Sequence, residues 1–449
     1  MTAGVILNRP VLLALGLPTL LAVIQQQLLL RQPPRLETLR EAPASSGPAA
    51  LQARFSRPMQ AASLGQASTL QPSLPHQWLG SGNSLLLTLG EGTRMNAPLE
   101  LLLAGHDPRG LALRPSRWLW DPRPRVVAVV QVPGGEQLQL RNHDGRWRPI
   151  SPVWRAIPVL RPLGNGSGVA AGSRLADGRL QLWMIPIAQH SLRRLTPNPG
   201  LLQVGIPRPL RRDPVQFAHL SSNRRGDLLV QSGGLEPHTN STELQLSTGG
   251  RQRLNWDASG PMLLAPEGGA VLVPSTEGLN LHTMPPLMPR AQTLPGSRDL
   301  SSFCPQAGRA VLVRHWPDFR RSLELVEPGQ APRPLWLGDD AVLATACSRG
   351  GQRVWALLLD GIRQPQLSVV AFNNRGQPVA RRMLSGWEAE PGTGLHWDPT
   401  TGQLLTVLRP KPGLIGRRQP ARTALIDGNR LEVRVSGPPV SQAQWLPAG

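Results

Sequence analysis

From position 76 to the C-terminus, short apolar runs alternate with turns rich in Gly, Pro, Asn and Asp. The clearest unit is GLHWDPTTGQLLTVLR at 394–409. An apolar entry ends in a Trp-Asp-Pro corner, a Thr-Thr-Gly turn follows, and residues 403–409 form a mostly apolar run. Apolar runs of this length, bounded by turn residues, predict two strands joined by a tight turn.

Similar strand-turn-strand units recur at intervals of roughly 40 to 50 residues, a period typical of propeller blades. Proline sits in the turn of several copies because it presets φ, and glycine follows because it accepts the positive φ needed before the chain turns back. The copies are Trp78–Leu89, Trp120–Val130, Ser173–Trp183, Ser221–Val230, Leu264–Val273, Phe303–Val313, Ala346–Leu358 and Trp397–Leu408.

Further strands are expected between these copies, for example Leu138–Asn142 and Gln366–Phe372. Four strands in each unit predict an all-β fold over residues 76–449. We expect a β-propeller of about eight four-stranded blades, or of seven if the first unit is a cap.

The cassette of an aromatic residue or Ser, then Pro, then Gly and an apolar run resembles the repeats of TolB-like and related WD-like β-propellers. It is clear in the copies at Trp120, Leu264, Phe303 and Trp397, and it is weak in the first copy and in the Ser221 copy. The segment Val440–Gly449 looks like a further cassette that stops after its turn. The resemblance implies that this segment closes the ring by adding a strand to the blade made by the other terminus.

The N-terminal residues 1–30 contain Arg9, the apolar stretch Val11–Ile24 and three leucines that end at Leu30. This pattern predicts an apolar helix that serves as an export signal or a signal anchor, and about twenty residues suffice to span a bilayer. No small-residue cleavage site follows closely, so we favour an uncleaved anchor over a cleaved signal peptide. Residues 31–75 are rich in Pro, Ala, Ser and Gln and are interpreted as a linker.

Arginines flank the apolar segment on both sides, so the distribution of positive charge leaves a cytoplasmic orientation open. We favour a membrane-anchored chain whose folded part lies in the periplasm or an equivalent exported compartment, because a lone apolar segment ahead of a β domain most often exports it.

The formal net charge of +20 suggests an anionic partner. However, Lys411 is the only lysine, there is no tyrosine, and the arginines are dispersed as pairs such as Arg211-Arg212 and Arg320-Arg321. An excess of arginine over lysine, with no tyrosine, also arises in GC-rich genomes without selection for a ligand. Nucleic acid is therefore not favoured as a partner.

The two cysteines, Cys304 and Cys347, occupy matching places in consecutive repeats and should be neighbours in space. A disulfide requires Cα atoms within about 7 Å. Equivalent inner-strand positions of adjacent blades usually lie somewhat farther apart. Two buried thiols are the interpretation that we favour, and a disulfide is the alternative if the strands converge.

No motif assigns a catalytic, cofactor-binding or metal-binding residue. The nine histidines are scattered, and none has the spacing of a metal-ligand pair. There is no Gly-x-Ser-x-Gly elbow, and the glycine-rich run 164–168 precedes a strand, whereas phosphate binding needs a helix N-terminus. We therefore expect no cofactor and do not favour an enzyme.

Tryptophans beside arginines in loop-like segments are typical of a binding face. The alternative is that they are partly buried loop anchors. His396 is included because it has no counterpart in the other copies. The candidate binding face consists of Trp118, Arg146, Trp147, Arg148, Trp154, Arg155, Trp387 and His396.

These observations favour a binding or assembly module for a protein partner or an anionic envelope component, attached to the membrane through its N-terminal helix. The alternative is a propeller enzyme, a glycan lyase or hydrolase, with its site at the mouth of the central channel. That alternative requires carboxylates, or His and Arg, from several blades to meet in one pocket.

Overall fold

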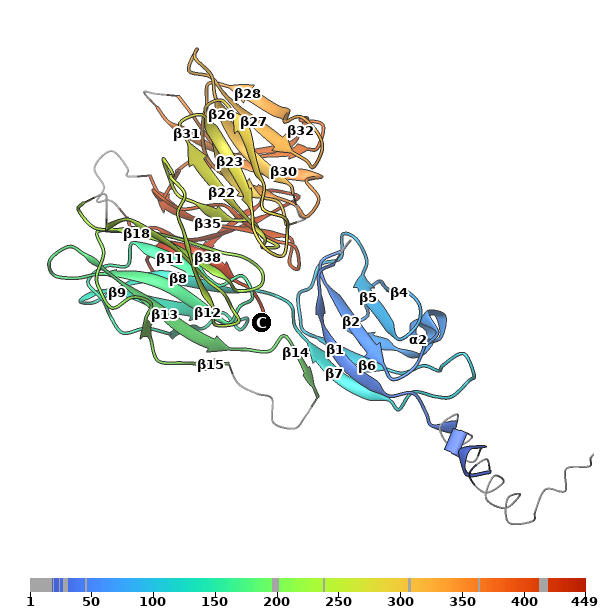
Figure 1. Ribbon diagram of the computed structural model, residues 1–449. Helices are drawn as coiled ribbons and strands as arrows, with labels where there is room; N and C mark the ends of the chain where they lie inside the picture. Colours follow the sequence, from blue (N-terminus) through green and yellow to red (C-terminus); the bar gives the residue numbers. More distant parts are fainter. Residues whose placement is uncertain are drawn as a thin grey trace, which may run out of the picture. The chain divides into compact units, whose positions relative to one another are not determined.

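The computed structural model describes residues 18, 20–23, 25–26, 31–44, 47–195, 202–236, 239–305, 308–361, 364–411 and 419–449. These residues form an all-β protein that divides into two units (Figure 1). Unit 1 comprises residues 1–93, 97–120 and 192–197, and unit 2 comprises the remainder. The predicted anchor over 1–30 lies largely outside the described residues. Within the described part of the chain, no helix has both the length and the apolar character needed to span a bilayer.

Unit 1 contains two four-stranded antiparallel sheets and a short helix, α2 (Ala61–Ala67). The first sheet has the order β1 (Leu36–Ala42), β2 (Ala50–Phe55), β5 (Ser84–Leu89), β4 (His76–Leu79). The second has the order β14 (Leu192–Arg194), β7 (Ser116–Trp120), β6 (Leu99–Leu103), β3 (Thr69–Gln71).

The prediction of a linker over 31–75 is therefore wrong, because β1, β2, α2 and β3 lie within it. In β2, Leu51, Ala53 and Phe55 are buried while Arg54 is exposed, so the strand has the alternation of a half-buried sheet. Small and polar residues around it concealed that alternation. The first predicted repeat, Trp78–Leu89, also belongs to unit 1 and not to the ring described next.

The described residues of unit 2 form seven antiparallel sheets that follow one another along the chain, except that the C-terminal strand β38 joins the first sheet. We number the sheets in chain order. From the inner to the outer strand, the first four are as follows: β38 (Val440–Leu446), β8 (Arg125–Val132), β9 (Gly135–Arg141), β10 (Trp147–Pro149); β11 (Val159–Pro162), β12 (Gly168–Arg174), β13 (Leu180–Ala188) with β15 (Gln203–Val204) and β16 (Arg208–Pro209); β17 (Phe217–Ser222), β18 (Leu228–Gly233), β19 (Ser241–Gln245), β20 (Arg251–Leu254); and β21 (Leu263–Leu264), β22 (Ala270–Ser275), β23 (Gly278–Thr283), β24 (Ala291–Pro295).

The remaining three sheets complete the unit. They are β25 (Arg298–Phe303), β26 (Ala310–His315), β27 (Arg321–Val326), β28 (Arg333–Gly338); β29 (Ala341–Cys347), β30 (Arg353–Asp360), β31 (Gln366–Asn373), β32 (Pro378–Met383); and β33 (Trp387–Ala389) and β34 (His396–Asp398), which both pair with β35 (Gln403–Pro410), then β36 (Arg422–Asp427) and β37 (Val433–Ser436).

Most sheets pack an apolar face on the next. Separate buried clusters join sheets one and two, two and three, three and four, five and six, and six and seven. β23 of the fourth sheet contacts β25 of the fifth. Another cluster joins the seventh sheet to the first through residues such as Leu405, Val407, Val126 and Val440. A series of antiparallel sheets of four or five strands that returns to its start in this way is a β-propeller.

The C-terminal strand closes this ring. β38 pairs antiparallel with β8, so the last strand of the chain is the inner strand of the first sheet. Trp445 lies opposite Val126, the position that Trp397 takes opposite Leu404 in the seventh sheet. The predicted role of Val440–Gly449 is confirmed. The Trp120 copy is split instead, because β7 joins unit 1 while β8 belongs to the ring.

The structure also corrects the third predicted repeat. The turn within Ser173–Trp183 joins β12 to β13, which are the second and third strands of their sheet. The turn that leaves the inner strand lies earlier, between Pro162 and Gly168, in the glycine-rich run. Eight blades were favoured from the sequence, whereas the described part of unit 2 contains seven sheets.

Candidate functional site

The residues of the predicted binding face are divided between the two units. Trp118 is in unit 1, where the guanidinium of Arg194 lies 5.4 Å from its ring. In unit 2, Trp147 packs into the core between the first and seventh sheets, while its neighbours Arg146 and Arg148 are exposed. Thus the Arg-Trp-Arg sequence at the start of β10 places its tryptophan inward and its arginines outward.

The other two tryptophans of that prediction also lie between sheets. Trp154 packs beside the core of the first and second sheets and stacks on Trp183 with 5.7 Å between ring centroids, and its exposed neighbour Arg155 donates to the Ala176 carbonyl. Trp387 packs beside the core of the sixth and seventh sheets. Within unit 2, Trp147, Trp154 and Trp387 thus pack against three different clusters between sheets.

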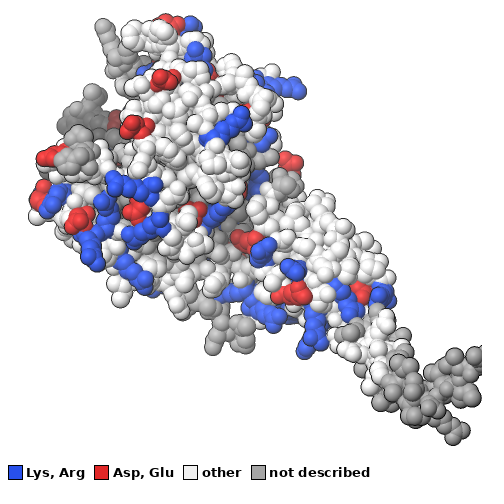
Figure 2. All heavy atoms as spheres, viewed as in Figure 1, with Lys and Arg blue, Asp and Glu red and all other residues white. Residues whose placement is uncertain are grey.

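On the face shown in Figure 2, red side chains are scattered among more numerous blue ones. Many arginines are paired with a carboxylate nearby, for example Arg123 with Asp121 at 2.7 Å and Arg320 with Asp318 at 2.6 Å. The guanidinium of Arg123 and the ring of His143 hold the pKa of Asp121 well below its usual range despite burial, which acts in the opposite direction. Local pairs therefore neutralise part of the positive charge.

Cys304 and Cys347 form a disulfide, with 1.97 Å between the sulfurs and 4.8 Å between the Cα atoms. Cys304 follows β25, and Cys347 ends β29, so the bond joins the inner strands of the fifth and sixth sheets. These strands approach more closely than the sequence led us to expect. Beside the bond, the Thr345 hydroxyl lies 2.8 Å from the Ser301 hydroxyl and 2.7 Å from the Ser302 hydroxyl.

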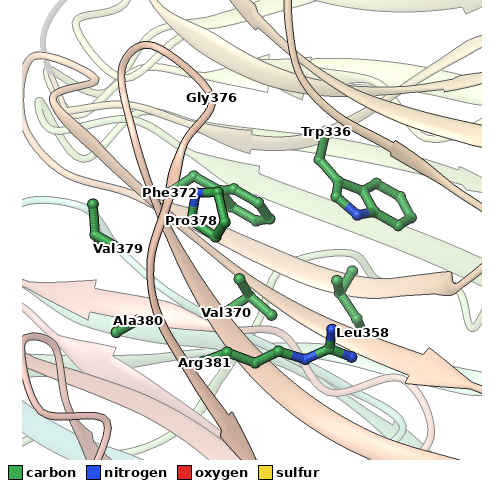
Figure 3. Close-up of a pocket in the computed structure, with 9 residues that line it drawn as sticks. All are labelled: Trp336, Leu358, Val370, Phe372, Gly376, Pro378, Val379, Ala380 and Arg381. Carbon is green, nitrogen blue, oxygen red and sulfur yellow. The ribbon is translucent and has the colours of Figure 1, made fainter.

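A concave apolar site lies between the fifth and sixth sheets (Figure 3). It encloses about 440 Å³ between β28 and the hairpin of β31 and β32. Leu358, Val370 and Phe372 form its buried floor, and the half-buried ring of Trp336 stands across from Phe372. We call this site the groove.

The two ends of the groove differ. At one end the tip of the β31–β32 hairpin touches β28: a Cβ on Gly376 would lie 2.8 Å from the Leu335 carbonyl oxygen, so only glycine fits there. At the other end the exposed side chain of Arg381 extends toward Leu358. Its charge also acts on Asp340, whose pKa is raised mainly by burial. The groove therefore offers an apolar floor, an aromatic wall and a charged rim.

Sequence reasoning did not single out Trp336. Arg333–Gly338 has the alternating pattern of an ordinary outer strand, so nothing local marks Trp336. Most of the residues that line the groove with it come from the next sheet. The irregular register at Leu335 could not be read from the sequence either.

A second group of polar residues lies on the inner strands around the ring axis. Gln444 Nε2 donates to the Leu160 carbonyl at 2.9 Å, and Arg161 Nε donates to the Leu220 carbonyl at 3.0 Å. His396 occupies the corresponding inner-strand position of the seventh sheet, and burial, followed by the charge of Arg161, lowers its pKa to about 4. Sequence reasoning named His396 but not Arg161, which it counted with the dispersed surface charge.

The carboxylate of Asp398, two residues after His396, already has hydrogen-bond partners. Asp398 is buried and accepts hydrogen bonds from the backbone N–H of Thr400 and Thr401 and from both hydroxyls. Burial raises its pKa against these bonds. Asp398 therefore caps the cassette turn. No cluster of three or more metal-binding side chains occurs within the ranges that the structure describes.

No protein-family model matches this chain, and no curated protein matches its sequence. Solved structures resemble it in fold. A 6-phosphogluconolactonase homologue from Bacteroides uniformis shares 14% identity at a TM-score of 0.46, over 72% of this chain and 99% of its own. TolB from Acinetobacter baumannii shares 11% identity at a TM-score of 0.40, over 79% of this chain and 81% of its own. The β-propeller domain of the Trilobed protease from Pyrococcus furiosus shares 9% identity at a TM-score of 0.43, over 76% of this chain and 95% of its own.

At these identities and TM-scores the likenesses carry no functional argument. The fold rests on the strand pairing, which confirms the predicted propeller repeat in unit 2.

Proposed function

We propose that this chain is a propeller binding module, with seven blades, and that its groove takes a bulky apolar side chain from a protein partner. The observation that carries the proposal is the groove itself, with its floor of Leu358, Val370 and Phe372 facing Trp336. Concave apolar sites with an aromatic wall are where interfaces concentrate their binding energy.

The surroundings of the groove favour a polypeptide over a small molecule. β28 and β32 are the outermost strands of their sheets, so each has backbone groups that no further strand pairs within the described residues. An extended segment beside such an edge can pair its backbone while a side chain enters the groove. Val379 and Met383, which are 47% and 40% exposed, add apolar surface on β32. Arg381 at the rim suits a carboxylate or a backbone carbonyl of the partner.

Export and membrane attachment are part of this proposal. They are supported by the apolar stretch Val11–Ile24 and by the disulfide, since disulfides persist in oxidising compartments. Alkylation of the cysteines in intact cells before and after reduction tests this part. Recovery of free thiols without reduction would contradict export.

Quantitative co-purification from membranes tests binding at the groove. The wild-type chain is compared with Val379→Asp, which places a charge on an exposed position of the groove, and with Trp336→Ala. The matched control is Trp316→Ala, a half-buried tryptophan directly after β26 of the same sheet that lies beside Arg314 and outside the groove.

We expect both groove variants to lose the partner and the control to retain it. A central aromatic anchor typically contributes about 2 kcal/mol, or about thirtyfold in affinity. Recovery of the same proteins in the same amounts with all three variants would refute the groove as the binding site.

A further inference from the structure

Arg161 is placed in the interior of the ring by the register of its sheet. It lies on β11 opposite Ala170, and Ala170 belongs to the apolar cluster between the second and third sheets. Directly paired residues of an antiparallel sheet project from the same face. Arg161 therefore points from the second sheet toward the third, where its Nε atom bonds the Leu220 carbonyl.

The charge of Arg161 is not neutralised by the protein. Among the described residues, no carboxylate pairs with it, and its Nη1 and Nη2 groups have no protein partner. Burial lowers the pKa of this guanidinium, which reflects the cost of holding the charge in the interior. Other deeply placed arginines are paired: Arg298 Nε lies 2.8 Å from a Glu324 carboxylate oxygen, and Arg409 pairs with Glu390.

Two polar side chains on the preceding inner strands, His396 and Gln444, are neutral. His396 is uncharged near neutral pH because its pKa is about 4. Its strand is held in place by Trp445, whose Nε1 donates to the His396 carbonyl at 2.9 Å. Gln444, on the strand between them, already donates to Leu160. One unpaired positive charge beside neutral groups suits a singly charged anion.

We propose that Arg161 anchors a site on the ring axis that binds a carboxylate. The free Nη1 and Nη2 groups form the paired donors that match the two carboxylate oxygens. Arg161 and His396 both keep part of their surface accessible, so the site is within reach of solvent. Neither group is used by the groove, and this site does not depend on the proposed function.

A purely structural role is the competing explanation, because Arg161 ties β11 to β17 just as Gln444 ties β38 to β11. The substitution Arg161→Gln separates the two roles. Gln444 shows that a glutamine at the corresponding position can reach the next inner strand. The variant therefore keeps the hydrogen bond between the strands and loses the charge.

The test titrates the full-length chain in detergent with sodium acetate, against chloride at constant ionic strength. Isothermal calorimetry follows binding, and thermal unfolding follows stability. We expect acetate to bind the wild-type chain and raise its unfolding temperature, and Arg161→Gln to weaken binding at least about tenfold. Equal binding by both proteins, or no binding by the wild-type chain, would overturn the site.

If Arg161→Gln does not fold, Arg161→Lys replaces it. That variant keeps the charge but gives up the paired donors, and it should also bind acetate at least about tenfold more weakly. Unchanged binding would count against the site. A parallel titration with a blocked glutamate peptide separates two sources of the carboxylate: tighter binding of the peptide indicates a protein side chain, and tighter binding of acetate indicates a small acid.

Discussion

The indole N–H of Trp445 donates a hydrogen bond to the carbonyl oxygen of His396 at 2.9 Å. Trp445 lies on the C-terminal strand of the first sheet, and His396 lies on the inner strand of the seventh. The bond therefore joins the two sheets at which the ring closes, beside the apolar cluster that they share.

Replacing Trp445 with phenylalanine should lower the free energy of unfolding by about 1 kcal/mol, because it removes this bond and retains an aromatic ring. Leu446→Ala, at a fully buried neighbouring position, should cost about 3 kcal/mol through the cavity it leaves. Denaturant unfolding measures both values. Hydrogen exchange should become faster in β8 and in β35 together, and a change confined to β8 would argue against the coupling of the two sheets.

A pair of glycines tests the corrected position of the second sheet's inner turn. Gly166 has a φ of +72°, and a Cβ there would lie 2.2 Å from the Pro447 carbonyl oxygen. Gly178 has a φ of +87° and open space around it. Gly178→Ala should cost about 1 kcal/mol from backbone strain alone, whereas Gly166→Ala should cost about 3 kcal/mol or more.

Thermal and denaturant unfolding of the two alanine variants provide this comparison. Equal losses would mean that the turn at Gly166 does not pack against the C-terminal segment.

The strand-turn-strand pattern at 397–408 was predicted correctly because proline and glycine act locally: β34 and β35 flank the predicted turn. The same local chemistry misled at Gly178, since glycine turns join middle strands as well as inner ones. The repeat interval of 40 to 50 residues alone does not distinguish these two kinds of turn.

The groove and the axial arginine could not be predicted for a different reason. Trp336 and Phe372 meet only because neighbouring sheets pack, and the distance between them along the sequence carries no local signal. Arg161 has the sequence context of a surface charge, and only ring closure buries it. Sequence thus predicted the architecture of unit 2 but not its sites, and it missed unit 1 because alanine and polar residues obscured β1 and β2.

The ion pair between Arg94 and Asp427 predicts a pH dependence of stability. Arg94 Nη1 lies 2.5 Å from Asp427, and the backbone N–H groups of Asn429 and Arg430 also donate to that carboxylate. Although burial opposes them, these donors lower the pKa of Asp427 from 3.8 to about 2. Because its pKa is lowered, the ionised carboxylate stabilises the fold at pH values above the ordinary pKa of about 4. This contribution is lost as the pH falls from about 4 to about 2.

Asp427→Asn keeps an oxygen for the backbone donors and removes the charge. At pH 7 the variant should be less stable by about 1 kcal/mol, a value that allows for the partial exposure of the pair. The difference should shrink as the pH approaches 2. Chemical denaturation at several pH values measures it, and a difference that stays constant down to pH 2 would show that the charge contributes nothing.

The most direct test of binding at the groove is photo-crosslinking in cells that make this chain naturally. A photoreactive residue is placed at Val379, on the groove, and in a separate chain at Gln292, an exposed position on the outer strand β24 of the fourth sheet. We predict a discrete protein adduct from position 379 that disappears when Trp336→Ala is added, and no such adduct from position 292. The same adduct from both positions, or an adduct from position 379 that survives Trp336→Ala, would contradict the account.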